Sequence, residues 1–86
     1  MRMYVSVLRI DGVWKIYSPD VNSIFSISED EYKNGNYESI IENIKHSLTS
    51  MPDPTYVVIV KTKQWMRENG FSLDNFIKVI PIEFEV

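Results

Sequence analysis

The chain has 86 residues, a formal net charge of −3, and 44% hydrophobic against 24% charged residues. This balance argues against intrinsic disorder, and the acidic excess disfavours direct binding to nucleic acid, because proteins that follow a phosphate backbone carry a basic excess. The chain contains no cysteine, which excludes disulfide bonds, thiolate nucleophiles and cysteine-bound zinc.

A chain of this length is expected to form one domain over residues 1–86 with a modest hydrophobic core. Its N-terminal stretch, MRMYVSVLRIDG, holds no apolar run long enough for a signal peptide. The longest apolar run, Tyr56 to Val60, is far too short to cross a bilayer. These patterns predict a cytoplasmic protein without a membrane partner.

The N-terminal part of the chain predicts the strands of an antiparallel meander. Met3 to Ile10 is rich in β-branched and aromatic residues and ends at Asp11-Gly12, a strong hairpin signal because a type I′ turn needs positive φ at both central residues. Val13 to Tyr17 is the return strand. Ser18-Pro19-Asp20 breaks the ladder, and Ile24 to Ser28 resumes it as the third strand.

A polar loop and the main helix are predicted next. The loop covers Glu29 to Asn36, and Asn36 is suited to cap the helix that follows. Apolar residues recur at helical spacing from Tyr37 to Met51, which is the clearest periodic signal in the chain. Pro52-Asp53-Pro54 ends this helix.

The C-terminal part predicts a strand, a short helix and an edge strand. Tyr56 to Val60 is apolar without alternation, as in a strand covered on both faces. Thr62 to Asn69 fits a short helix, with its first residue as N-cap and a glycine just beyond its end. Phe76 to Val86 alternates as the last strand, and Pro81 places it at a sheet edge or a bulge.

The expected architecture is therefore a single α+β domain with the element order β-β-β-α-β-α-β. One main helix packs on a four- to five-stranded sheet, and residues 61–86 supply the short helix and the edge strand. No internal repeat, low-complexity segment or interdomain linker divides the chain.

Residues suited to catalysis or metal binding are sparse. The single histidine, His46, falls on the polar face of the predicted helix, and no further ligands are spaced to join it. The cluster Glu29-Asp30-Glu31 offers oxygen ligands for a divalent cation, but adjacent carboxylates at a strand end point to opposite sides, which favours a solvated acidic loop. These charges are also suited to meet a basic partner. We therefore expect a chain without enzymatic activity, cofactor or metal.

Several of these features together resemble the N-terminal domain of HicB-type antitoxins and the related small stand-alone HicB-like proteins. The shared features are the strand ending in Asp11-Gly12, the aromatic return strand Trp14 to Tyr17, the corner Ser18 to Val21, the strand Ile24 to Ser28, and the helix Tyr37 to Leu48 with its sequence ESIIENIKHSL. The resemblance covers roughly residues 3 to 60. It implies a partial RNase H-like fold without nuclease activity, and a role in sequestering HicA, a small basic toxin ribonuclease.

The chain also departs from the family pattern. Asn22-Ser23 stands where the family usually has a glycine, and the loop before the main helix is longer than usual. Nothing from Lys61 onward reads as the C-terminal DNA-binding segment that these antitoxins generally carry. The resemblance therefore implies sequestration of a partner rather than regulation of an operon.

We expect a non-enzymatic module that binds and inhibits another protein, foremost a small basic HicA-like ribonuclease. The expected contact residues lie in the return strand, the corner after it and the acidic cluster: Trp14, Tyr17, Ser18, Asp20, Asn22, Glu29, Asp30 and Glu31. For Trp14 and Tyr17, filling the core is an equally good interpretation. The alternatives are a phage- or mobile-element-encoded inhibitor of a host or CRISPR nuclease, and a structural homo-oligomer, such as a homodimer, that pairs through the edge strand Phe76 to Val86.

Overall fold

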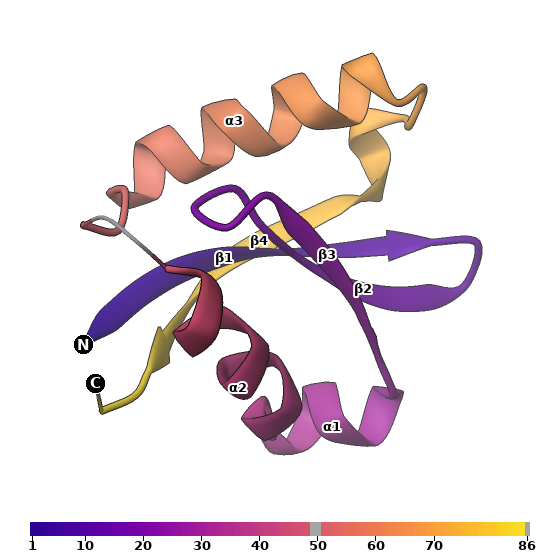
Figure 1. Cartoon of the computed structure of the whole chain (residues 1–86). Helices are drawn as coiled ribbons and strands as arrows, with labels where there is room; N and C mark the ends of the chain where they lie inside the picture. Colours follow the sequence, from indigo (N-terminus) through magenta and orange to yellow (C-terminus); the bar gives the residue numbers. More distant parts are fainter. Residues whose placement is uncertain (49–50, 86) are drawn as a thin grey trace.

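The computed structural model describes residues 1–48 and 51–85, and it shows an antiparallel sheet with helices on both faces (Figure 1). In chain order the elements are β1 (Arg2–Ile10), β2 (Val13–Ser18), β3 (Ser23–Ile27), α1 (Glu29–Asn34), α2 (Glu38–Ser47), α3 (Thr55–Glu68), the 3-10 turn η1 (Leu73–Asn75) and β4 (Phe76–Glu83). The strands lie in the order β3-β2-β1-β4. The predicted single-domain α+β class is confirmed. Among the described residues, no helix combines the length and apolar character needed to cross a membrane.

The meander forms as the sequence predicts. Asp11 and Gly12 have φ angles of 52° and 76°, so they form the expected left-handed turn, and Ile10 pairs with Val13 across it. β2 then pairs with β3 in an unbroken register from Trp14 opposite Ile27 to the β2–β3 turn. The edge position predicted from Pro81 is also confirmed, because β4 is the outer strand beside β1.

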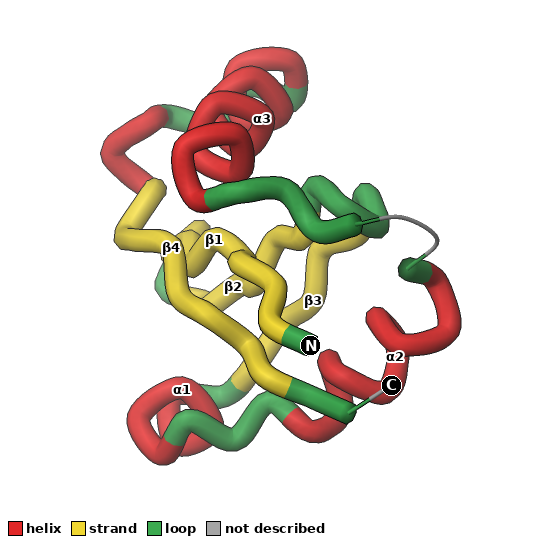
Figure 2. Tube along the Cα trace, turned by 90° about the vertical axis from the view of Figure 1, so that its left-hand side faces the viewer, coloured by secondary structure: helices red, strands yellow, loops and turns green. Residues whose placement is uncertain are grey.

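The sheet is covered on both faces, by α1 and α2 on one side and by α3 on the other (Figures 1 and 2). β1 is therefore buried on both sides, and its alternate residues enter different cores. The core beneath α1 and α2 contains Met3, Val5, Val7, Ile16, Ile27, Ile40, Ile44 and Ile82. The core beneath α3 contains Leu8, Ile10, Tyr17 and Met66.

The predicted strand Tyr56 to Val60 is wrong, because this segment is the first half of α3. Its β-branched residues favour a strand, but intrinsic propensity is weak and packing overrides it. The buried residues of α3 are Val58, Thr62 and Met66, which recur every fourth residue and form one helical face. Thr62 is therefore a buried mid-helix residue rather than an N-cap. The helix order after β3 is α1-α2-α3, and the described residues between these helices form no strand.

The predicted loop from Glu29 to Asn36 is also wrong, because its first six residues form α1. Ser28 and Glu31 make a reciprocal capping box: Ser28 Oγ accepts from the Glu31 N–H at 3.1 Å, and Glu31 Oε1 accepts from the Ser28 N–H at 3.0 Å. Gly35 closes the helix in the left-handed conformation with φ 66°.

The main helix and the last strand are shorter than predicted. α2 ends at Ser47, and its N-cap residue is Tyr37 rather than Asn36. The predicted helix continued to Met51 through residues 49 and 50, which lie outside the described residues. β4 ends at Glu83, and Val86, the last residue of the predicted strand, likewise lies outside them.

Replacing Ser28 by alanine is expected to lower the free energy of unfolding by about 1 kcal/mol, because the Glu31 N–H loses its side-chain acceptor. Urea unfolding followed by circular dichroism measures the change. Ser39→Ala in the exposed first turn of α2 is the matched control and should shift stability by less than about 0.5 kcal/mol. Equal effects in the two variants would contradict the capping interpretation.

Candidate functional site

The corner between β2 and β3 holds several of the residues predicted to contact a partner. Tyr17 and Ser18 are buried, with exposed fractions of 4% and 0%. Asn22 is exposed at the tip, with φ 49°, and its Oδ1 accepts from the Tyr17 hydroxyl at 3.4 Å. Only the outer part of this corner therefore presents side chains to solvent, and the contact roles of Tyr17 and Ser18 stay predictions.

Asp20 uses this corner to hold the segment that precedes α3. Its Oδ1 accepts from the backbone N–H of Asp53 at 3.0 Å, and the Asp53 carboxylate in turn bonds to Lys61 Nζ at 2.6 Å. Asp20 Oδ2 is buried and has no hydrogen-bond partner among the described residues. The arrangement connects the β2–β3 turn to α3 through one backbone hydrogen bond and one ion pair.

The environment raises the pKa of Asp20. Burial penalises its charged form and is the largest cause, and the Asp53 carboxylate adds to it. The hydrogen bond from the Asp53 N–H and the Lys61 ammonium act in the opposite direction. Asp20 therefore carries its negative charge at a cost that a solvated aspartate does not have.

Asp20→Asn is expected to gain stability relative to the parent protein as the pH rises from about 4 to about 7. A carboxyl with a raised folded-state pKa stabilises the fold below its unfolded pKa, and that contribution is lost as the pH rises through the folded pKa. The asparagine does not ionise, and its Oδ1 can still accept from the Asp53 N–H. Urea midpoints of both proteins over this range measure the difference, and two parallel curves would contradict it.

Two aromatic stacks lie on opposite faces of the sheet. Trp14 stacks on Tyr32 of α1 with ring centroids 4.2 Å apart, and the Arg9 guanidinium lies 4.4 Å from the Trp14 centroid. On the other face, Tyr17 stacks on Trp65 of α3 at 4.4 Å. Trp14 is half-buried. The two predicted aromatic anchors are therefore both engaged in packing helices onto the sheet, and they do not share a surface.

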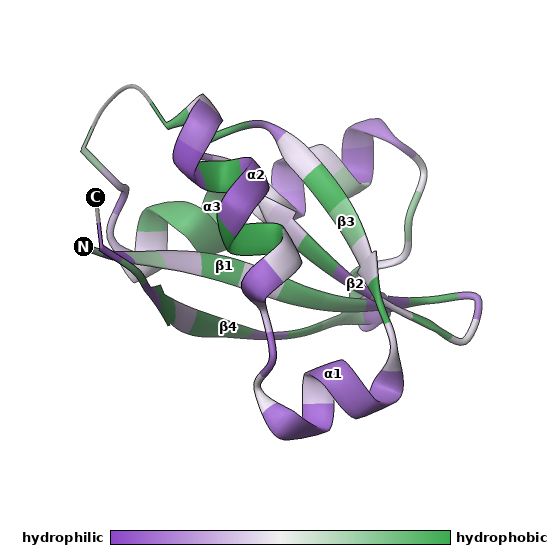
Figure 3. Ribbon diagram, turned by 60° about the horizontal axis from the view of Figure 1, so that its bottom comes forward, coloured by the Kyte–Doolittle hydropathy of each residue, from purple (hydrophilic) through white to green (hydrophobic). Residues whose placement is uncertain are grey.

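The acidic cluster occupies the first turn of α1. Glu29 and Asp30 are exposed, whereas Glu31 is half-buried and engaged in the capping box. A helix start favours these carboxylates, because its free N–H groups carry partial positive charge. Figure 3 shows α1 in hydrophilic colours along most of its length. β3 separates this cluster from the Ser18–Ser23 corner, so the structure places the two predicted contact regions at opposite ends of one edge strand.

Sequence reasoning missed a set of exposed apolar residues around α3. Met51, Tyr56 and Val60 are exposed by 85%, 71% and 63%. The spacing of Tyr56 and Val60 is one helical turn, so this signal becomes visible only once the segment is recognised as a helix. Lys61 was missed for the same reason, whereas the role of Asp53 arises from its contact with the distant Asp20.

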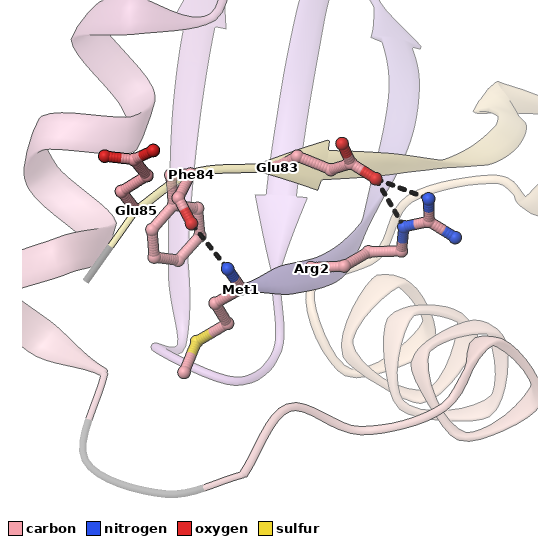
Figure 4. Close-up of a pocket in the computed structure, with 5 residues that line it drawn as sticks. All are labelled: Met1, Arg2, Glu83, Phe84 and Glu85. Carbon is pink, nitrogen blue, oxygen red and sulfur yellow. Dashed lines mark hydrogen bonds and ion pairs between the residues drawn. The ribbon is translucent and has the colours of Figure 1, made fainter.

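A shallow pocket lies where β1 and β4 meet, lined by Met1, Arg2, Glu83, Phe84 and Glu85 (Figure 4). Its main charges are already paired. The Met1 ammonium donates to the Phe84 carbonyl at 2.6 Å, and Arg2 Nε donates to Glu83 Oε1 at 2.8 Å. Within residues 1–48 and 51–85, no group of three or more histidine, aspartate or glutamate side chains is placed to hold a metal ion. The pocket offers an ion-paired surface and no reactive group.

Comparison with known proteins finds no matching family, curated protein or solved structure. The HicB resemblance therefore stays a prediction. Of the elements predicted over residues 3–60, the three strands and the main helix are present, whereas Tyr56 to Val60 is helical.

Proposed function

We propose that the chain is a non-enzymatic protein-binding module that inhibits a basic partner, foremost a small ribonuclease of the HicA type. The observation that carries the proposal is the acidic layer formed by α1 and α2 on one face of the sheet. Residues 29–47 contain five carboxylates, Glu29, Asp30, Glu31, Glu38 and Glu42, against the two lysines Lys33 and Lys45.

The charge is distributed unevenly between the helices on the two faces. α3, on the opposite face, carries Lys61, Lys63 and Arg67 against the single carboxylate of Glu68. An uneven distribution of this kind orients an approaching charged protein and raises its rate of association. A basic partner is therefore expected to approach the acidic helices α1 and α2 in preference to the basic helix α3.

The contact on this face is expected to centre on the exposed start of α1. Glu29 faces Lys33 one turn later at 3.8 Å, a weak exposed pair that a partner's arginine or lysine can replace. Asp30 makes no ion pair among the described residues. Tyr32 and Trp14 fix α1 on the sheet from behind, so these carboxylates are held in place before a partner binds.

The test is affinity capture of the tagged full chain from its native cell lysate, followed by assay of the salt-released fraction for RNA cleavage. We expect a small basic protein at near-equal amount, with ribonuclease activity that the added chain suppresses. The variant Glu29→Lys/Asp30→Lys should lose both capture and suppression. Glu31 is left unchanged, because its carboxylate caps α1.

The matched control reverses charge on the other face. Lys63→Glu/Arg67→Glu should retain capture and suppression, because α3 is not part of the proposed contact. Equal loss in both double variants, or capture that survives reversal of Glu29 and Asp30, contradicts the proposal. If the salt-released fraction instead contains a large multidomain nuclease, the partner is a host or CRISPR nuclease rather than a small ribonuclease.

A further inference from the structure

The two edges of the sheet are protected to different degrees. At the β4 edge, Met1 and Phe84 exchange reciprocal backbone hydrogen bonds, Met1 N to Phe84 O at 2.6 Å and Phe84 N to Met1 O at 3.0 Å. Bonded and non-bonded pairs alternate along an antiparallel ladder. Pro81, opposite Tyr4 in the same register, therefore directs its nitrogen outward, where a proline has no N–H to offer.

Other features also protect the β4 edge. The strand carries the charged residues Lys78 and Glu83, and the register of its pairing with β1 shifts between Val7 and Leu8. Charges, prolines and irregular pairing are the devices by which edge strands avoid joining a further strand. These charges, the proline and the register shift all oppose a homodimer through β4, which was one of the interpretations of the sequence.

The residues of β3 provide none of these devices, and the nearest charge is Lys15 of β2, whose Nζ donates to Ser26 Oγ at 2.7 Å. The strand itself reads Ser-Ile-Phe-Ser-Ile, without charge, proline or glycine. The tight turn at Asp11-Gly12 makes Ile10 and Val13 a bonded pair. Alternation along β2 then directs Trp14, Ile16 and Ser18 toward β3 and leaves the backbone groups of Ile24 and Ser26 pointing outward.

We propose that β3 pairs with β3 of a second copy of the chain, antiparallel, about a two-fold axis at Phe25. In this register Ile24 lies opposite the second copy's Ser26, and both residues direct their N–H and C=O groups across the seam. Phe25 then lies opposite the second copy's Phe25 in a non-bonded pair, where side chains approach most closely. The sheets of the two copies become one continuous sheet.

The edge itself favours a second copy as the occupant. An isologous contact requires a surface that complements itself. When a second β3 is placed antiparallel to the first, the outward-pointing backbone groups of Ile24 in each copy meet those of Ser26 in the other. β3 contributes no charged residue of its own to the seam. Ile24 is 39% exposed, and the proposed register places it diagonal to the second copy's Ile24 on the α3 side of the sheet. The contact is short, so we expect a dimer in the micromolar range.

Sedimentation equilibrium of the full chain from about 1 to about 500 µM should show a reversible monomer–dimer transition. Ile24→Lys should raise the dimer Kd at least about tenfold, because it places two lysine side chains at diagonal positions near the axis. Ile77→Lys is the matched control, since Ile77 is an isoleucine on the other edge strand with 43% exposure. A monomer throughout the range, or a dimer broken by Ile77→Lys and not by Ile24→Lys, overturns the proposal.

A cysteine cross-link tests the register independently. The chain has no cysteine, so a single introduced thiol reports only its own contact. Non-bonded antiparallel pairs have the Cα separation that a disulfide needs. Phe25→Cys should form a covalent dimer under mild oxidation at concentrations near Kd, and Ile77→Cys should not. Cross-linking of both variants at equal rates would indicate random collision and would refute the two-fold register.

Discussion

Replacing Trp65 by alanine is expected to destabilise the protein by about 3 kcal/mol. The ring centroid of Trp65 lies 4.4 Å from that of Tyr17 and 5.5 Å from that of Phe71. Trp65 therefore joins α3 both to the sheet and to the segment that returns to β4. The loss is large against the total, because an 86-residue domain has a free energy of unfolding of only about 4 to 13 kcal/mol. Urea unfolding followed by circular dichroism measures it.

Trp65→Phe is the matched control, because a phenylalanine keeps a ring against Tyr17 and should lose about half as much stability as Trp65→Ala. An alanine variant as stable as the phenylalanine variant would show that the stack contributes little. Fluorescence adds a second reading: Trp14 is then the only tryptophan, and its emission should stay that of a half-buried ring because its stack lies on the opposite face.

Thr62→Val is expected to cost about 1 to 3 kcal/mol, although it changes one buried atom. The hydroxyl groups of Ser6 and Thr62 bond to each other at 2.6 Å, and both residues are 0% exposed. The valine leaves the Ser6 hydroxyl buried without this partner. Ser6→Ala/Thr62→Val removes both hydroxyls, so the double variant should be more stable than Thr62→Val alone. Unfolding free energies of the double-mutant cycle measure the coupling, and additive losses would contradict it.

The parts of the fold that the sequence predicts are those governed by neighbours along the chain. The β1–β2 hairpin follows from Asp11-Gly12, whose turn geometry is local. The capping box of α1 was also visible, since Ser28 and Glu31 have the required spacing, but the polar composition around them suggested a loop. Local signals of this kind fix where an element begins and leave its packing open.

The sequence does not predict α3 as one helix, because the pattern of its first half favours a strand and that of its second half favours a helix. The run Tyr56 to Val60 is short and β-branched, and a short apolar run fits a buried strand as well as a helix. The helical spacing appears only when Val58 is joined to Thr62 and Met66, across the lysines between them. All three residues are buried on the side of α3 that faces the sheet, and the position of the sheet cannot be read from the sequence.

The candidate site depends on contacts between distant residues, and these could not be predicted. Asp20 is an ordinary turn aspartate until the Asp53 N–H, 33 residues away, supplies its partner. Trp14 and Tyr17 lie on opposite faces of β2, and helices cover both faces. Their aromatic character therefore does not reveal which of them is exposed to solvent. The charge of the α1–α2 layer, in contrast, could be read from the composition of residues 29–47.

The position of β1 between β2 and β4 has a consequence for how the chain acquires its fold. Arg2 of β1 pairs with Glu83 of β4, so one of the two strands that flank β1 is synthesised after the other elements described above. During synthesis the hairpins of β1, β2 and β3 can assemble early, whereas one side of β1 waits for β4. Contacts of such long sequence separation slow folding, since a long loop must close before they stabilise the chain. A nascent chain lacking β4 thus exposes an apolar strand that a chaperone or a neighbouring chain can pair with first.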